Sequence, residues 1–252
     1  MIEEIFDIEH SPDIEVRVES GRVELTEGGP GRVEVKVDTK DPGFTVERLG
    51  NTILVSSDKS QPWLSRGSSY VTIVTPPGSD LSVSVASANV DCSVPLGKVE
   101  AKTASGDVSL DRVTTLIVKT ASGDVRVEGV DQALRFSSAS GDLFVQDSCH
   151  GSVVVSTASG DVRIGDCDAD LAVNTVSGDV RVSRFSGRSG SFKGMSGKID
   201  LGIPSRTRVD LDVNLLSGHL SVPEPDPNRE PPERSMSLGA KLVSGDFTIH
   251  RV

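Results

Sequence analysis

The sequence predicts an all-β protein built as a parallel β-solenoid, in which short strands coil and each turn stacks on the one before. Three observations predict this fold class. The motif TASGDV and close variants of it recur through the middle of the chain, and the glycine of the motif returns about every 18 residues. Apolar and polar side chains alternate on both sides of that glycine. A fixed period is typical of repeat architectures, and alternation with period two is typical of strands with one buried face.

The period is defined by eight glycines, which we expect to occupy structural turns. From the first to the sixth they are 17 to 19 residues apart, and the last two intervals are 21 and 27 residues. The glycines are Gly106, Gly123, Gly141, Gly160, Gly178, Gly197, Gly218 and Gly245. A degenerate unit, LSVSVASANVDC, extends the series upstream with Ala88 in the place of the glycine. The repeats therefore begin near residue 81.

Each unit is predicted to be two short strands joined at the Ser-Gly turn. Around Gly160, for example, Val153 and Val155 precede the turn and Val162 and Ile164 follow it. The parity of the apolar positions changes across the glycine, so the backbone must absorb a one-residue shift there. Glycine absorbs such a shift at low cost because it can adopt a positive φ or a bulge. The Thr or Ser three residues earlier is expected to cap backbone groups of the turn.

Stacking of equivalent strands gives parallel sheets, and the general preference of crossover connections favours right-handed coils. Residues 81–222 are predicted to form the solenoid and residues 236–252 its final rung. The proline-rich segment 223–235, PEPDPNREPPERS, is predicted to be a surface loop between the last two repeats.

Residues 1–80 are predicted to form an N-terminal antiparallel β cap. The run DIEVRVESGRVEL fits the repeat template with Gly21 at the turn. The other alternating runs are separated by TEGGPG, KDPG and SDKSQPWLSRG, and such turn-rich separators indicate hairpins. Trp63, the single tryptophan, lies in the last of these, where it either packs against the cap or anchors a ligand.

The charge and the cysteines exclude several classes of protein. With 37 acidic and 26 basic residues the net charge is −11, which disfavours nucleic acid and anionic lipid as partners. The three cysteines form no CxxC pair, so neither a zinc site nor a disulfide framework is expected. Cys149 and Cys167 occupy similar places in adjacent repeats and are expected to be neighbours. No cofactor is expected.

The beginning of the chain, MIEEIFDIEH, is acidic and has no apolar run, so no signal peptide is expected. No stretch of about 18 apolar residues is present to span a membrane. If residue 1 is the natural N-terminus, the sequence predicts a cytoplasmic protein.

The SGDV repeats, their alternating valines and the preceding VTPPGSDLSVSV resemble a bacterial β-strand-repeat family. This family is known as "putative adhesin" and is a domain of unknown function. The resemblance covers nearly the whole chain, and it implies a β-solenoid.

A column of aspartates follows the glycines: Asp107, Asp124, Asp142, Asp161 and Asp179. A carboxylate ladder could bind Ca²⁺, although calcium solenoids with GGxGxD units offer more oxygen ligands per turn. Alternatively, each aspartate caps its own turn by accepting local backbone N–H groups. Two exposed carboxylates about 5 Å apart repel by roughly 0.8 kcal/mol, whereas one hydrogen bond to a charged acceptor contributes roughly 1.5–3 kcal/mol. Capping alone can therefore hold the column together.

Catalysis finds little support in the sequence. The four histidines lie in no GxSxG or HExxH motif, and GRSGSFKGMSGK lacks the GK[ST] ending of a P-loop. We therefore expect no enzyme but a structural or interaction module, a rigid solenoid scaffold that presents a binding or self-assembly surface. A calcium-dependent adhesin-like module is the alternative, and a carbohydrate-active β-helix enzyme is a third possibility.

The expected partner is another protein or a second copy of the chain. The final rung, LGAKLVSGDFTIHRV, carries the full inward apolar pattern, and nothing follows it. An uncovered rung offers unpaired backbone groups to another strand. The sequence therefore predicts self-association, as a homodimer, at an edge that contains Leu238, Lys241, Phe247 and Ile249.

Overall fold

The computed structural model describes residues 1–57, 67–223 and 231–252, and every regular element in these ranges is a β-strand. The chain divides into two compact units, Met1–Val127 and Glu128–Val252, with the boundary inside β12 (Val125–Ser138). The all-β class is confirmed. Trp63 and most of the proline-rich segment 223–235 lie outside the described residues.

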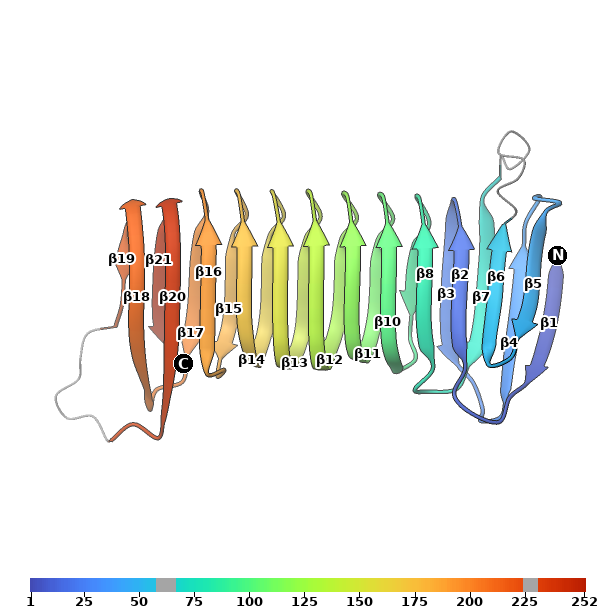
Figure 1. The fold of residues 1–252 in the computed structure, drawn as a ribbon, viewed down its shortest axis with the longest axis horizontal. Helices are drawn as coiled ribbons and strands as arrows, with labels where there is room; N and C mark the ends of the chain where they lie inside the picture. The colour runs from blue at the N-terminus through green and yellow to red at the C-terminus, as the bar shows by residue number, and fades with distance from the viewer. Residues whose placement is uncertain (58–66, 224–230) are drawn as a thin grey trace. The chain divides into compact units, whose positions relative to one another are not determined.

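The N-terminal unit contains β1 to β11 (Figure 1). Their bounds are β1 Ile2–Asp7, β2 Asp13–Val18, β3 Gly21–Glu27, β4 Arg32–Asp38, β5 Phe44–Leu49, β6 Thr52–Ser57, β7 Ser69–Thr75, β8 Asp80–Val85, β9 Asn89–Cys92, β10 Leu96–Thr103 and β11 Val108–Thr120. The C-terminal unit contains the remainder: β13 Leu143–Thr157, β14 Val162–Thr175, β15 Val180–Phe185, β16 Ser189–Gly194, β17 Lys198–Ile203, β18 Thr207–Ser217, β19 Leu220–Ser221, β20 Arg234–Ser244 and β21 Asp246–Arg251.

Parallel pairing in the N-terminal unit extends further toward the N-terminus than the sequence predicts. β2 pairs in parallel with β6 on one side and β8 on the other, and β3 pairs in the same way with β7 and β9. The coil formed by β2 and β3 therefore lies between two coils that follow it in the sequence (Figure 1).

The predicted antiparallel cap is found only in part. Antiparallel pairing joins β1 to β4, β4 to β7, and β5 to β6. β2 and β3 instead belong to the parallel stack, because DIEVRVESGRVEL follows the repeat template. Its apolar residues Ile14, Val16, Val23 and Leu25 are all buried. The cap is therefore restricted to β1, β4 and β5 with their partners.

The strands of the C-terminal unit stack in parallel, and one long strand can contribute to two faces of a coil. The first part of β14 pairs with β15, and its second part pairs with β16. Between β13 and β14 the register sets Val155 opposite Val173 and Thr157 opposite Thr175. Equivalent positions of successive repeats therefore lie side by side, as the glycine alignment predicts.

The rung order at the end of this unit differs from the sequence order. β20 lies between β16 and β18, and β21 lies between β17 and β19 (Figure 1). The last strands of the chain thus form an inner rung, and β18 with β19 forms the outermost rung.

The predicted edge is therefore wrong. Leu238 and Phe247 are fully buried, Ile249 is buried, and Lys241 lies between Lys193 of β16 and Asn214 of β18.

Side-chain volumes explain why β20 and not β18 lies against β16. Gly190 of β16 leaves room for a leucine, since a Cβ there would lie 2.6 Å from Cδ2 of Leu238. Phe192 stands opposite the small Ala240, and its ring meets that of Phe247 edge to face with centroids 5.9 Å apart. β18 would also place a leucine, Leu211, beside Gly190, but it would put the larger Val213 where Ala240 lies, so the fit against Phe192 favours the observed order.

Candidate functional site

The repeated turn closes through the hydroxyl that precedes it by three residues. In the C-terminal unit the N–H of Gly160 donates to Oγ1 of Thr157 at 2.9 Å, and the N–H of Gly178 donates to Oγ1 of Thr175 at 2.9 Å. The same bond is made by the pairs Gly106–Thr103, Gly123–Thr120 and Gly141–Ser138. The four threonines are buried. The hydroxyl column is thus an internal cap, as the sequence predicts.

Close stacking is the reason for glycine at the central turns. A Cβ at Gly160 would lie 2.0 Å from the carbonyl oxygen of Gly141, and one at Gly178 would lie 2.0 Å from that of Gly160. A positive φ, which the sequence also suggested, is found at Gly197, Gly218 and Gly245. Any side chain at the central turns would therefore collide with the backbone of the preceding rung.

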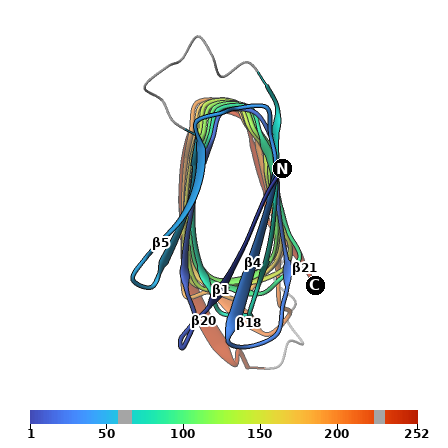
Figure 2. The same ribbon diagram turned by 90° about the vertical axis from the view of Figure 1, so that its right-hand side faces the viewer.

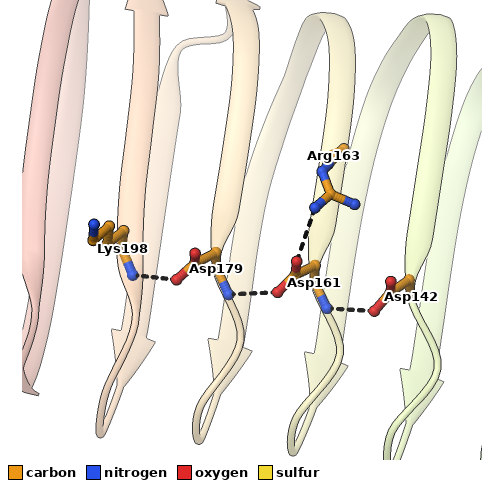
Figure 3. Close-up of polar contacts among 5 residues, drawn as sticks. All are labelled: Asp142, Asp161, Arg163, Asp179 and Lys198. Carbon is orange, nitrogen blue, oxygen red and sulfur yellow. Dashed lines mark hydrogen bonds and ion pairs between the residues drawn. The ribbon is translucent and has the colours of Figure 1, made fainter.

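The aspartates after these glycines connect successive rungs. In Figure 3 the N–H of Asp161 donates to Oδ1 of Asp142 at 2.8 Å, and the N–H of Asp179 donates to Oδ1 of Asp161 at 3.0 Å. The N–H of Lys198 donates to Oδ1 of Asp179 at 2.8 Å. Each carboxylate thus accepts a backbone hydrogen bond from the next rung, and the prediction that it caps a local N–H of its own turn is wrong.

The N-terminal unit repeats this arrangement with one informative exception. The N–H of Asp124 donates to Oδ1 of Asp107 at 3.0 Å, and the N–H of Asp107 donates to the side-chain oxygen of Asn89 at 3.1 Å. A neutral amide oxygen fills the same place as a carboxylate oxygen. The position therefore requires an acceptor, and a negative charge is not essential.

At two of the aspartates the second carboxylate oxygen also contacts a protein group. Oδ2 of Asp161 accepts a hydrogen bond from Nη2 of Arg163 at 2.9 Å (Figure 3), and Oδ2 of Asp124 lies 3.7 Å from Nη2 of Arg126. Both oxygens of Asp161 are engaged within the protein. Among the described residues, no group of three or more His, Cys, Asp or Glu side chains is arranged to hold a metal ion. Calcium binding by the column stays a prediction.

The cysteines are buried, unpaired thiols. Cys149 lies opposite Cys167 in the register of β13 and β14, so the expected neighbourhood is confirmed. A hydrogen bond with Cys149, together with burial, holds the pKa of the Cys167 thiol well above its ordinary value. Burial raises the pKa of Cys92 to about 11. Thiols that stay protonated are poor nucleophiles and poor metal ligands.

The sequence did not reveal a groove in the N-terminal unit. β5 projects from the stack in Figure 2, whereas β6 stays paired with β2. A groove of about 720 Å³ is lined by β5 and β6 together with β2, β8 and β10. Hydroxyls of Thr45, Ser56 and Ser84 line it together with Glu15 and Arg17, which form an ion pair with each other. The hydroxyls of Thr45 and Ser56 lie 3.2 Å apart and form a hydrogen bond, so several of the polar groups that line the groove already have partners within the protein.

The sequence also did not reveal the open rung of β18 and β19. Leu211 of β18 is 40% exposed and Leu220 of β19 is 48% exposed, whereas their register partners Leu238 and Phe247 are 0% exposed. These leucines occupy inward positions of the repeat, but no described strand stacks beyond them. The sequences of β18 and β19 show the same alternation as the buried strands. Only the order of the rungs in space reveals that their inward side chains stay exposed, and the sequence does not give that order.

A comparison with protein families shows which family the chain belongs to. The family model described as Toastrack DUF4097 matches residues 12–250. The chain belongs to this family. The Toastrack match includes strands of both units, and the expected membership of a family without an established function is confirmed.

Several solved structures are similar to this Toastrack chain. A "putative adhesin" from Bacteroides fragilis shares 16% identity with a TM-score of 0.46, covering 98% of this chain and 96% of its own. A "putative adhesin" from Parabacteroides merdae shares 12% identity with a TM-score of 0.43, at coverages of 99% and 95%. A "putative lipid binding protein" from Parabacteroides distasonis shares 16% identity with a TM-score of 0.44, at coverages of 99% and 96%. No curated protein matches the chain.

In the part of the chain that the structure describes, no helix is long and apolar enough to cross a membrane.

Proposed function

We propose that the protein is a non-enzymatic interaction module that binds a partner through the outermost rung of β18 and β19. The observation that carries this proposal is the exposure of apolar side chains at inward repeat positions, above all Leu211 and Leu220. Fully burying an exposed leucine side chain contributes about 1.5–3 kcal/mol, and because Leu211 is 40% and Leu220 48% exposed, a strand that covers this rung gains a little under half of that at each of them. The same partner can add backbone hydrogen bonds along β18.

The other conspicuous columns already have structural roles. The turn hydroxyls accept bonds from glycine N–H groups, and the aspartate oxygens accept bonds from neighbouring rungs. The cysteines are buried with raised pKa values at Cys92 and Cys167. The open rung differs from these columns, because its apolar side chains at inward positions stay exposed until a partner covers them.

The same proposal includes right-handed coils of about 18 residues and a cytoplasmic location. The bonds between successive rungs join residues that are 17, 18 or 19 positions apart, which supports the coil length. Crossover connections between parallel strands are generally right-handed. Unpaired cysteines are typical of proteins in a reducing compartment, and all three cysteines here are free.

The test is affinity capture with three forms of the chain. Wild type is compared with the edge variant Leu211→Lys/Leu220→Lys and with Met195→Lys, which alters an exposed apolar residue elsewhere in the C-terminal unit. A protein that is bound by wild type and by Met195→Lys, but not by the edge variant, supports the proposal. Identical recovery with all three forms would overturn it.

A further inference from the structure

The outermost strand, β18, carries an ordered pattern of charge on one of its faces. Arg206, immediately before the strand, and Arg208, Asp210 and Asp212 within it occupy alternate positions, and all four are exposed. Read along the chain, this face is positive, positive, negative, negative. The intervening positions carry Thr207, Val209, Leu211 and Val213. One face is therefore charged and the other is mainly apolar.

This order of charges is complementary to itself when two copies of the strand run antiparallel. In an antiparallel pair, two residues that lie directly across from each other point to the same face of the sheet. A positive and a negative side chain at such positions attract each other. If the two-fold axis passes through Val209, Arg208 faces Asp210 of the second copy and Arg206 faces Asp212 of the second copy. Symmetry repeats both pairs, so every charge on this face meets its opposite.

Resting on the proposed function of the open rung, we propose that its partner is a second copy of this chain, paired antiparallel through β18 about Val209. The same register sets Val209 against its own counterpart and Thr207 against Leu211 of the second copy. The half-exposed side chain of Leu211 is thereby covered. The dimer closes, because a two-fold interface uses the same surface on both copies.

Other arrangements of two β18 strands are less favourable electrostatically. A two-fold axis through Asp210 sets that carboxylate against itself, and an axis through Leu211 sets Asp210 against Asp212. A parallel in-register pair sets every charge against an identical charge. Like charges directly opposite one another are destabilising, so the charge order selects the axis through Val209.

The ion pairs of the single chain do not prevent this exchange. Arg208 lies 3.4 Å from Asp210 on the same strand, with side chains 70% and 63% exposed, and Arg206 pairs with Glu233. Exposed pairs of this kind contribute little. In the dimer the same groups acquire cross-strand partners beside newly covered apolar side chains, so association is expected to weaken as salt rises.

Charge inversion on the full chain tests this pairing by sedimentation velocity over a range of concentrations. Arg208→Asp alone and Asp210→Arg alone each set like charges opposite one another, and each should weaken dimerisation by at least about tenfold. An equimolar mixture of these two variants should form a heterodimer, because position 208 of one then faces the opposite charge at position 210 of the other. Lys193→Asp, an exposed inversion on β16, serves as the matched control and should dimerise as wild type does.

Each outcome decides between the possibilities. Restored association in the mixture supports the antiparallel register. A wild-type chain that stays monomeric at high concentration would overturn the inference, as would a mixture that remains monomeric while circular dichroism shows both variants folded. Capture of a different protein through the open rung, with no self-association, would preserve the proposed function and refute this inference. Failure of both experiments would refute both.

Discussion

At the scale of single residues, one hydrogen-bonding position recurs with different side chains. Asn89 and Asp107 occupy successive places in one column, and each accepts a backbone N–H from the next rung. The sequence predicted that the aspartates accept backbone hydrogen bonds, because repulsion between carboxylates is smaller than one charge-assisted hydrogen bond, but it predicted local donors in the same turn. It could not show which backbone group is capped, since the donor lies a full rung away.

Replacing Asp161 tests whether the column needs an acceptor or a charge. Asp161→Ala removes the acceptor of the Asp179 N–H and should lower the free energy of unfolding by about 1.5–3 kcal/mol. Asp161→Asn keeps an acceptor oxygen, as at Asn89, and should cost clearly less. Urea unfolding of both variants measures the difference. Equal losses would show that the charge is essential.

The close approach at the central turns predicts a large cost for the smallest side chain. A Cβ at Gly160 would lie 2.0 Å from the carbonyl oxygen of Gly141, so Gly160→Ala should lower the free energy of unfolding by about 2 kcal/mol or more. Gly29 has no atom within 4 Å of an added Cβ, and Gly29→Ala is the matched control. A loss at Gly160 no larger than that at Gly29 would contradict the stacking explanation.

The buried thiol of Cys92 predicts a loss of stability in alkaline solution. Burial raises its pKa from 9.0 to about 11, so the folded state retains the proton where the unfolded state releases it. Stability is therefore complete below pH 9 and should decrease by on the order of 2 kcal/mol as the pH rises to 11. Unfolding of wild type and Cys92→Ala at pH 8 and pH 10.5 measures this effect. The variant should lose less between the two values, and parallel losses would exclude Cys92 as the cause.

At the scale of strands and rungs, the alternating pattern predicted which residues face inward, and burial confirms it at most repeats. The strand with which each strand pairs could be predicted only where repeats that are consecutive in the sequence are also adjacent in the structure. β20 fits against β16 because Gly190, Phe192 and Ala240 have complementary volumes, and such complementarity is not visible in a pattern of apolar and polar letters. The antiparallel cap was overextended for a different reason, because DIEVRVESGRVEL fits the repeat template but was assigned to the cap with the hairpins around it.

The contact between Gly190 and Leu238 can be tested by a double-mutant cycle. A Cβ at Gly190 would lie 2.6 Å from Leu238 Cδ2, so Gly190→Ala should cost about 1–3 kcal/mol through overpacking. Leu238→Ala should cost about 2–5 kcal/mol by leaving a cavity. The double variant should lose less than the sum, because the added methyl group occupies part of that cavity. Additive losses in thermal or urea unfolding would mean that the two positions do not determine the fit of β20.

At the scale of the whole molecule, each unit contains one rung that is out of sequence order. β2 and β3 lie between later strands, and β20 and β21 lie between earlier ones. Repeats with the same inward pattern are nearly interchangeable as sequences, so spacing and alternation cannot determine their order. The fold class and the turn columns could therefore be predicted, whereas the open rung could not.

Truncation after Val222 distinguishes the two possible orders at the end of the C-terminal unit. If the last strands formed an outer rung, their removal would leave β18 and β19 paired with their neighbours. In the observed order, removal takes away the described partner strands of both β18 and β19. Hydrogen exchange in β18 should therefore become as fast as in an unfolded chain. Retained protection of β18 in the shortened chain would mean that β18 takes the place of β20 beside β16, and it would contradict the volume argument for the observed order.

The position of β20 and β21 also constrains synthesis on the ribosome. Residues 207–221 emerge before residues 234–251, yet their final hydrogen-bonding partners belong to the later segment. Until that later segment has been synthesised, β18 must either remain unpaired or temporarily occupy the place beside β16. In the second case it has to be displaced when β20 arrives. Translation speed from codon 222 to codon 233 can thus influence how much of the protein reaches its final state, although those codons contribute no described strand.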